Sequence, residues 1–353
     1  MTTGMWDVVV VGAGPCGSAL ACLLARAGAK VALVDRGRFE KRRPGELAAP
    51  ECKAAIRKLG LEHLLEHPFG TEIPSVLSAW GDEARNEYDF IRSAYGAAVS
   101  LDRRAFDQAL AYVAQAAGAD LRIGAPCRVK RGDDGRLSLY CGGDQIGYSR
   151  FVAICDGRHS TGSGLGVARL AVNDHVCIAG ILDEPLATHA MLVESVPQGW
   201  IYALNQPCGS SIIALNTRRE FAVGGQARQT LWRDACRHSR LIDAFAPLSR
   251  KPVIGVWNSA ASAARRIGGP DWCLLGDARF ASDPLSGQGL KHAFDDALVA
   301  ANHILAGTPE KLSAAMREQT RADVEEHAKA TMRFYGMENR FRESPFWCGI
   351  PRH

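Results

Sequence analysis

A glycine-rich turn near the N-terminus constrains the fold of this chain more than any other feature. Residues 7–11, which contain the apolar run Val8–Val11, are typical of a buried strand, and the turn Gly12-Ala13-Gly14-Pro15-Cys16-Gly17 follows directly. Residues 18–27 then show a helical pattern closed by Gly28, and a second strand-like run covers residues 30–34. This order predicts a strand–helix–strand unit with a Gly-x-Gly-x-x-Gly turn.

Each glycine of this turn has a distinct physical task. Gly12 allows the tight turn, Gly14 lets a pyrophosphate approach the helix N-terminus, and Gly17 lets the helix pack closely on the strand. Asp35, after the second strand, is placed to accept hydrogen bonds from ribose hydroxyls. We therefore predict a dinucleotide site of either FAD or NAD type, the alternative being a ligand-free turn. The predicted contacts are Gly12, Gly14, Pro15, Cys16, Gly17, Asp35 and Arg36.

Two later motifs favour FAD. The segment Cys155-Asp156-Gly157-Arg158-His159-Ser160 resembles the Asp-Gly motif of flavoprotein aromatic hydroxylases built like para-hydroxybenzoate hydroxylase. Gly276-Asp277-Ala278 and the loop from Asp283 to Leu290 resemble their Gly-Asp motif, and residues 103–107 resemble their Arg-x-x-Phe-Asp pattern. The resemblance implies that FAD is bound by Arg103, Asp156, Gly276, Asp277, Pro284, Gly287, Gln288, Gly289 and Leu290.

The same resemblance implies the architecture. The fold class is α/β, or α+β overall, with a Rossmann-like FAD-binding domain interleaved with an antiparallel substrate domain and followed by a helical C-terminus. The FAD-binding domain is expected at residues 1–70, 96–167 and 257–305, and the substrate domain at 71–95 and 168–256. Residues 306–353 form the C-terminal segment. Alternating patterns predict strands at 191–196, 199–204 and 211–216, and Asp102 is expected to cap a helix within 100–118.

Three further segments resemble the halogenase-related branch of this fold. They are Gly45-Glu46-Leu47-Ala48-Ala49-Pro50, the strand from Glu194 to Tyr202, and the tail from Tyr335 to Trp347. The resemblance is greatest to flavoprotein maturases that oxygenate a peptidyl tryptophan during tryptophylquinone biogenesis. Tryptophan halogenases carry Gly-Trp-x-Trp-x-Ile-Pro where this chain has Gly199-Trp200-Ile201-Tyr202, and the helical setting of Lys53 favours a solvated residue over their catalytic lysine.

The resemblance implies an FAD-dependent monooxygenase that hydroxylates an indole or phenol through a flavin hydroperoxide. O₂ is then a co-substrate, and the organic substrate is an aromatic small molecule or a tryptophan-containing precursor peptide. Because the sequence has no second Gly-x-Gly-x-x-Gly turn, electrons come from transiently bound NAD(P)H or from a partner flavin reductase. Three alternatives remain: a flavin-dependent halogenase, an FAD-dependent reductase or dehydrogenase, and a non-enzymatic flavin-binding scaffold.

Two residues are candidates for proton transfer. Glu46 lies in a loop that the resemblance places near the flavin ring, although it also suits an exposed helix cap. His292 opens the helix after the second flavin motif, where a packed or solvated side chain is equally suited. Trp200 and Tyr202 alternate along one strand, so they face the same side and line either an aromatic substrate pocket or the core.

Composition excludes several other classes. The 11 cysteines include no Cys-x-x-Cys pair, which argues against a disulfide framework or a zinc site and predicts mostly reduced, buried thiols and no metal. The net charge is +4, and the charged residues form no long run of one sign, so no nucleic-acid partner is expected. The N-terminus lacks a basic leader and no apolar run reaches about 18 residues, so we expect a cytoplasmic protein without a membrane partner.

Overall fold

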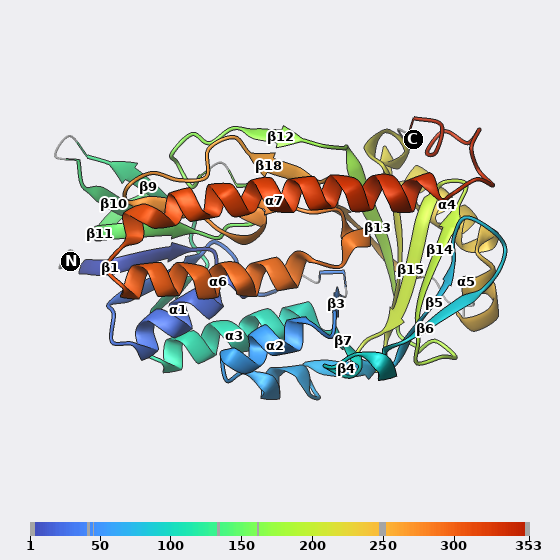
Figure 1. Cartoon of the computed structure of the whole chain (residues 1–353), viewed down its shortest axis with the longest axis horizontal. Helices are drawn as coiled ribbons and strands as arrows, with labels where there is room; N and C mark the ends of the chain where they lie inside the picture. The colour runs from blue at the N-terminus through green and yellow to red at the C-terminus, as the bar shows by residue number, and fades with distance from the viewer. Residues whose placement is uncertain are drawn as a thin grey trace.

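The N-terminal strand–helix–strand unit forms the centre of a large mixed sheet in the computed structural model. This structure describes residues 4–40, 43–44, 46–132, 135–160, 162–246 and 252–349. Parallel pairing runs through five strands in the order β8, β2, β1, β11 and β19. Their bounds are Asp120–Ile123, Val31–Asp35, Gly4–Val11, Asp144–Ile154 and Trp272–Leu274. The helices α1 (Pro15–Arg26), α2 (Cys52–Lys58), α3 (Arg103–Ala116) and α6 (Gly289–Leu305) share its hydrophobic core (Figure 1).

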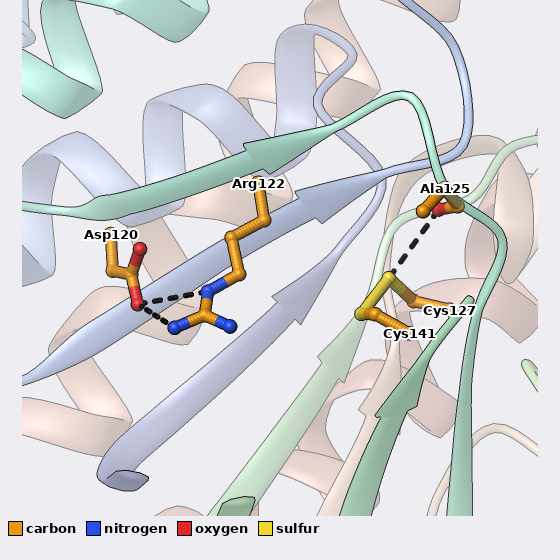
Figure 2. The surroundings of a disulfide bond; sticks show 5 residues. All are labelled: Asp120, Arg122, Ala125, Cys127 and Cys141. Atoms are coloured by element: carbon orange, nitrogen blue, oxygen red, sulfur yellow. Dashed lines mark hydrogen bonds and ion pairs between the residues drawn. A yellow bond between two sulfur atoms is a disulfide. The ribbon is translucent and has the colours of Figure 1, made fainter. Parts of the chain in front are cut away.

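A hairpin extends this sheet and contains a disulfide bond that no sequence motif predicts. β9 (Cys127–Arg131) and β10 (Leu137–Cys141) are antiparallel, and β10 also pairs with β11. Their register places Cys127 directly opposite Cys141 with Cα atoms 4.2 Å apart, and a disulfide joins them (Figure 2). The expectation of reduced thiols is therefore wrong for this pair, because the hairpin brings together residues that no local motif links. The buried free cysteines are Cys16, Cys22, Cys52, Cys155, Cys177, Cys236 and Cys273.

A second large sheet stands beside the first. Its strand order is β17, β13, β16, β15, β14, β5 and β6. Their bounds are Val253–Asn258, His175–Leu182, Ser211–Arg218, Gly199–Asn205, Met191–Val196, Ser75–Ala79 and Asn86–Asp89. The pairing is antiparallel except between β14 and β5, which are parallel. One face packs against α4 (Gly225–His238) and α5 (Arg240–Phe245), through Trp232 and Leu241 among others (Figure 1).

Two small sheets and several short helices connect these units. One sheet contains β3, β7 and β4, and the other contains β12, β18 and β20. The strands cover Glu46–Ala48, Ala98–Leu101, Gly70–Ile73, Arg169–Ala171, Ser262–Ala264 and Phe280–Ala281. The 3₁₀ helices cover Glu62–Leu65, Phe90–Arg92, Arg219–Ala222, Gly276–Ala278 and Pro284–Ser286.

The last long helix spans both large sheets. α7 (Pro309–Gly336) runs from the first sheet to the second (Figure 1). Residues 337–349, here called the C-terminal strap, then lie on the second sheet. The strap is fixed there because Trp347 Nε1 donates to Val196 O at 2.7 Å, and the buried Glu338 accepts from Gly81 N at 3.1 Å. Among the described residues, no helix has the length and apolar character needed to cross a membrane.

The observed fold confirms the expected α/β class and several local features. The Asp102 side chain accepts hydrogen bonds from Arg104 N and Ala105 N, so it caps α3 as predicted. The predicted strand at residues 191–196 coincides with β14, and helices fill most of the segment after residue 289. The interpretation of residues 168–256 as strands was incomplete, because α4 and α5 lie within this range.

Candidate active site and flavin-binding site

The glycine turn has the geometry that its sequence predicts. Gly12 has φ +106°, and a Cβ there would lie 2.3 Å from Cys155 O. A Cβ on Gly17 would lie 1.9 Å from Gly12 O, so helix and strand approach more closely than any side chain permits. Gly14, by contrast, has no heavy atom within 4 Å of its ideal Cβ. The N-terminus of α1, which begins at Pro15, therefore faces open space.

The acidic residue after β2 supports this turn. One oxygen of Asp35 accepts from Ala13 N at 2.8 Å, and the other accepts from Gly37 N at 2.7 Å. Arg36 is exposed beside it. Cys16 is buried beneath the turn, and a hydrogen bond with Cys155, together with burial, raises the pKa of its thiol. This thiol is therefore a protonated packing group at neutral pH.

Two arginines hold the Gly-Asp motif in place. Neither is among the FAD contacts that the sequence predicts. Arg158 Nη2 lies 3.1 Å from Asp277 Oδ2, and Arg169 Nη2 donates to the backbone oxygen of Asp277 at 3.1 Å. Arg169 also donates to Ala278 O. Two buried polar atoms nearby, Asp156 Oδ1 and Arg158 Nη1, have no hydrogen-bond partner among the described residues. Arg158 lies within the motif quoted from the sequence, but nothing local distinguishes Arg169.

Residues 283–289, here called the flavin loop, are anchored by a single carboxylate. Asp283 is 1% exposed, and its Oδ1 accepts from Leu285 N at 3.0 Å. Its Oδ2 accepts from the Tyr335 hydroxyl at 3.1 Å and lies 3.3 Å from His175 Nδ1. Burial raises the pKa of Asp283, but the hydrogen bond and charge of His175, together with the Leu285 N–H and the charge of His327, outweigh burial and the net pKa is lowered. Asp283 therefore stays ionised and ties the loop to β13 and α7.

A buried ion cluster supports the other end of this region. Arg279, 1% exposed, contacts Asp296 through Nε at 2.5 Å and Asp323 through Nη2 at 2.6 Å. Asp296 also accepts from Gly276 N at 2.7 Å, and Gly276 has φ +58°. The cluster thus links the Gly-Asp turn to α6 and α7.

The structure places Glu46 next to the flavin loop. Its Oε1 would lie 3.5 Å from a Cβ on Gly289, and its Oε2 accepts from Arg103 Nη1. Arg103 also binds Asp107 through two hydrogen bonds of 3.0 Å. Burial lowers the pKa of Arg103, but Asp107 and Glu46 outweigh burial and raise it above its usual value. Glu46 belongs to β3 and is paired, so it does not cap a helix here.

Trp200 and Tyr202 lie on the face of the second sheet opposite α4 and α5. Trp200 is 2% exposed, and its Nε1 donates to the Tyr335 hydroxyl at 2.9 Å. Tyr202 is 9% exposed; burial, then the neighbouring Cys177 and Glu46, raise the pKa of its hydroxyl. The flavin loop packs on this face through Leu285. The Tyr202 hydroxyl is therefore close enough to Glu46 to interact with its charge, whereas Trp200 is hydrogen-bonded to Tyr335 of α7.

His292 has a different environment from Glu46. Its ring lies against Phe280 in a tilted arrangement with centroids 6.2 Å apart, and His327 of α7 packs on the same phenyl ring at 5.5 Å. Its Nδ1 is buried without a partner among the described residues. These contacts place His292 in the packing between α6 and α7.

This histidine pair predicts how stability depends on pH. Burial lowers the pKa of both His292 and His327 in the folded chain. Histidines of an unfolded chain protonate near pH ~6.5, so below this pH the unfolded state binds more protons. We expect the free energy of unfolding to decrease as the pH falls from 7 to about 5. Denaturant titrations should show a shallower decrease in the double variant His292→Gln/His327→Gln, whereas the exposed His63→Gln should match the native slope.

The residues of this region fit FAD. The open space at Gly14 suits a pyrophosphate, and Asp156 Oδ1 and Arg158 Nη1 offer buried polar groups that the described residues leave unpaired. Asp277 presents its carboxylate beside Arg158, at 31% exposure. Gly287 and Gly289 leave backbone close to the surface at the start of α6. A flat ring system can approach such a loop without meeting side chains.

The chain is similar in sequence to two classes of reductase. The menaquinone reductase of Mycobacterium tuberculosis is 28% identical over 323 residues, which cover 84% of this chain and 75% of that protein. The digeranylgeranylglycerophospholipid reductase 2 of Methanopyrus kandleri is 30% identical over 298 residues, covering 81% of this chain and 73% of the relative.

Solved structures show the same fold in a halogenase and in a dihydroxylase. The myxobacterial chondrochloren halogenase CndH aligns with a TM-score of 0.84 and 19% identity, covering 98% of this chain and 85% of that chain. The peptidyl tryptophan dihydroxylase QhpG aligns with a TM-score of 0.78 and 24% identity, covering 99% and 80%. A family model described as FAD binding domain matches residues 5–335. The chain therefore belongs to the FAD binding domain family and is a flavoprotein oxidoreductase.

Proposed function

We propose that this protein is an FAD-dependent monooxygenase that hydroxylates an electron-rich aromatic ring. The observation that carries the proposal is the position of Glu46: a carboxylate lies beside the flavin loop at Gly289 and opposite the aromatic face of the second sheet. Hydroxylation of an indole or phenol requires a group that accepts the ring N–H or O–H proton. Reduction of a carbon–carbon double bond instead consumes a proton, so it calls for a proton donor at this position and not for an acceptor.

The chain also shields the neighbouring aromatic face of the second sheet from water. Tyr335, Phe346 and Trp347 are each no more than 2% exposed, and they cover the face that carries Trp200. When bound and reduced, FAD supplies the electrons that activate O₂ for insertion into the ring. The covering residues limit the access of water from the side of the second sheet, and the ion pair with Arg103 holds the Glu46 carboxylate beside the flavin loop, where we propose that it accepts the proton.

The proposed substrate is an indole or phenol, either free or within a tryptophan-containing peptide. The fold shared with a peptidyl tryptophan dihydroxylase supports the peptide-borne form. We further infer that NAD(P)H or a partner reductase delivers the electrons, because the chain has one Gly-x-Gly-x-x-Gly turn.

A reductase is the second candidate, and its support is the 28–30% identity to the two reductases. A halogenase is the third, supported by the likeness to the chondrochloren halogenase. Lys53 does not favour halogenation, because its Nζ lies 4.0 Å from Glu72 on β4 rather than at the flavin loop.

Rapid mixing tests the proposal directly. The FAD-loaded protein is reduced without oxygen and then mixed with O₂ in the presence of indole or phenol compounds, with and without chloride. We expect a transient spectrum that differs from both reduced and oxidised FAD, and a hydroxylated product. Direct return of the oxidised spectrum without product would support the reductase, and a chlorinated product would support the halogenase.

Glu46→Gln is expected to lower turnover of the accepted aromatic substrate by about 100-fold, because the amide cannot accept the ring proton. FAD content should be unchanged, since Arg103 keeps both hydrogen bonds to Asp107. Steady-state product formation measures the effect, and Glu72→Gln, which alters a carboxylate that is 77% exposed, is the matched control. A Glu46→Gln enzyme with native turnover would contradict the proton-accepting role.

A further inference from the structure

The second sheet contains a buried carboxamide without a hydrogen-bond partner. Asn216 of β16 is 1% exposed, and neither its Nδ2 nor its Oδ1 has a partner among the described residues. Buried polar side chains in folded proteins nearly always have such partners, because an unmade hydrogen bond in the interior is costly. An unpaired asparagine at this depth therefore calls for a ligand group or a specific structural reason.

The register shows which way this side chain points. Asn216 is directly opposite Trp200 of β15 and Cys177 of β13, so the three side chains lie on one face of the sheet. This is the face on which Leu285 of the flavin loop packs. Tyr202 hydrogen-bonds to Cys177, and it interacts with the charge of Glu46. Asn216 thus lies beside Cys177, whose partner Tyr202 interacts with the carboxylate beside the flavin loop.

The neighbouring polar groups are already used. Trp200 Nε1 donates to the Tyr335 hydroxyl, and that hydroxyl donates to Asp283. The thiol of Cys177 is hydrogen-bonded to Tyr202. Burial raises the pKa of this thiol to about 12, so the thiol is neutral. None of these groups is therefore available as a hydrogen-bond partner for the carboxamide of Asn216, which offers a donor and an acceptor side by side.

We propose that Asn216 determines substrate specificity by recognising an amide group attached to the aromatic ring of the substrate. An amide carries an acceptor and a donor side by side and pairs with both atoms of the asparagine. A carboxylate has no donor, and an alkyl group has neither. The inference rests on the proposed function, because it places the ring beside Glu46 and pairs the amide with Asn216.

Two probes of the same shape test this assignment: indole-3-acetamide and 3-isobutylindole. Dissociation constants are obtained from the perturbation of the flavin absorbance of the oxidised holoenzyme. The native protein should prefer the amide by about tenfold or more, since two hydrogen bonds are lost with the alkyl probe. Asn216→Leu should abolish or reverse this preference. Equal binding of the two probes to the native protein, or a preference that survives Asn216→Leu, would overturn the assignment.

A stability measurement separates recognition from a structural role. If Asn216 serves the substrate, Asn216→Leu removes an unpaired amide and should unfold at the native midpoint or above it. A clear decrease of the midpoint would mean that the carboxamide holds the fold together, which contradicts the inference. The rapid-mixing experiment with O₂ tests the proposed function separately. If the native protein preferred the amide probe but formed no hydroxylated product, only the monooxygenase proposal would be refuted, and recognition of an amide by Asn216 would not be.

Discussion

Gly14→Val is expected to produce a folded protein that no longer retains FAD. The ideal Cβ of residue 14 meets no heavy atom within 4 Å, and φ is −80°, so the chain itself accommodates a side chain. The isopropyl group would instead fill the space at the N-terminus of α1 into which a pyrophosphate approaches. We expect the affinity for FAD to fall by at least about 100-fold, equivalent to about 2.8 kcal/mol.

Fluorescence titration of the apoprotein with FAD measures this loss, and circular dichroism confirms the fold. Gly17→Ala is the contrasting variant, because its Cβ would lie 1.9 Å from Gly12 O and must displace backbone. It should lose both fold and FAD. A Gly14→Val protein that purifies with full FAD content would refute the assignment of the pyrophosphate site.

Arg279→Leu is expected to have the largest effect on stability. The guanidinium is 1% exposed, and Asp296 and Asp323, with which it pairs, are 2% and 6% exposed. Removing the cation leaves two carboxylates together in the interior, where each lacks its counter-charge. Breaking a buried ion pair in this way costs about 3–5 kcal/mol. The Gly276 turn should also lose its support, because Asp296 accepts its N–H.

Urea denaturation of the FAD-loaded and FAD-free proteins would quantify this effect. Arg237→Leu is the control, since Arg237 is 75% exposed and its pair with Asp234 should contribute less than about 1 kcal/mol. If Arg279→Leu unfolded at the native urea concentration, the cluster would contribute no net stability.

Features set by local sequence were the predictable ones. The turn from Gly12 to Gly17 and the cap at Asp102 depend on neighbouring residues, and the structure reproduces both. α4 was missed although Trp232, Ala235 and Cys236, which are all buried, have helical spacing. Because strand patterns lie on both sides of this segment, the segment was also interpreted as alternating strands.

Features set by register could not be predicted. The Cys127–Cys141 bond needs the β9–β10 alignment, and the role of Arg169 needs β12 to lie beside the Gly-Asp turn. His292 shows the same limit, because its position after the flavin loop is consistent with either face of α6. The structure places its ring against Phe280 of β20, which also contacts His327 of α7.

The span of α7 across both sheets has a consequence for the order of folding. The flavin loop depends on Tyr335 for one of its anchors, and the Gly-Asp turn depends on Asp323 through Arg279. Both residues are synthesised more than 250 positions after the glycine turn that they help to complete. During translation the first strand–helix–strand unit is therefore available early, whereas the complete FAD-binding site can form only after α7 has left the ribosome. We therefore expect each newly synthesised chain to bind FAD only late in its folding.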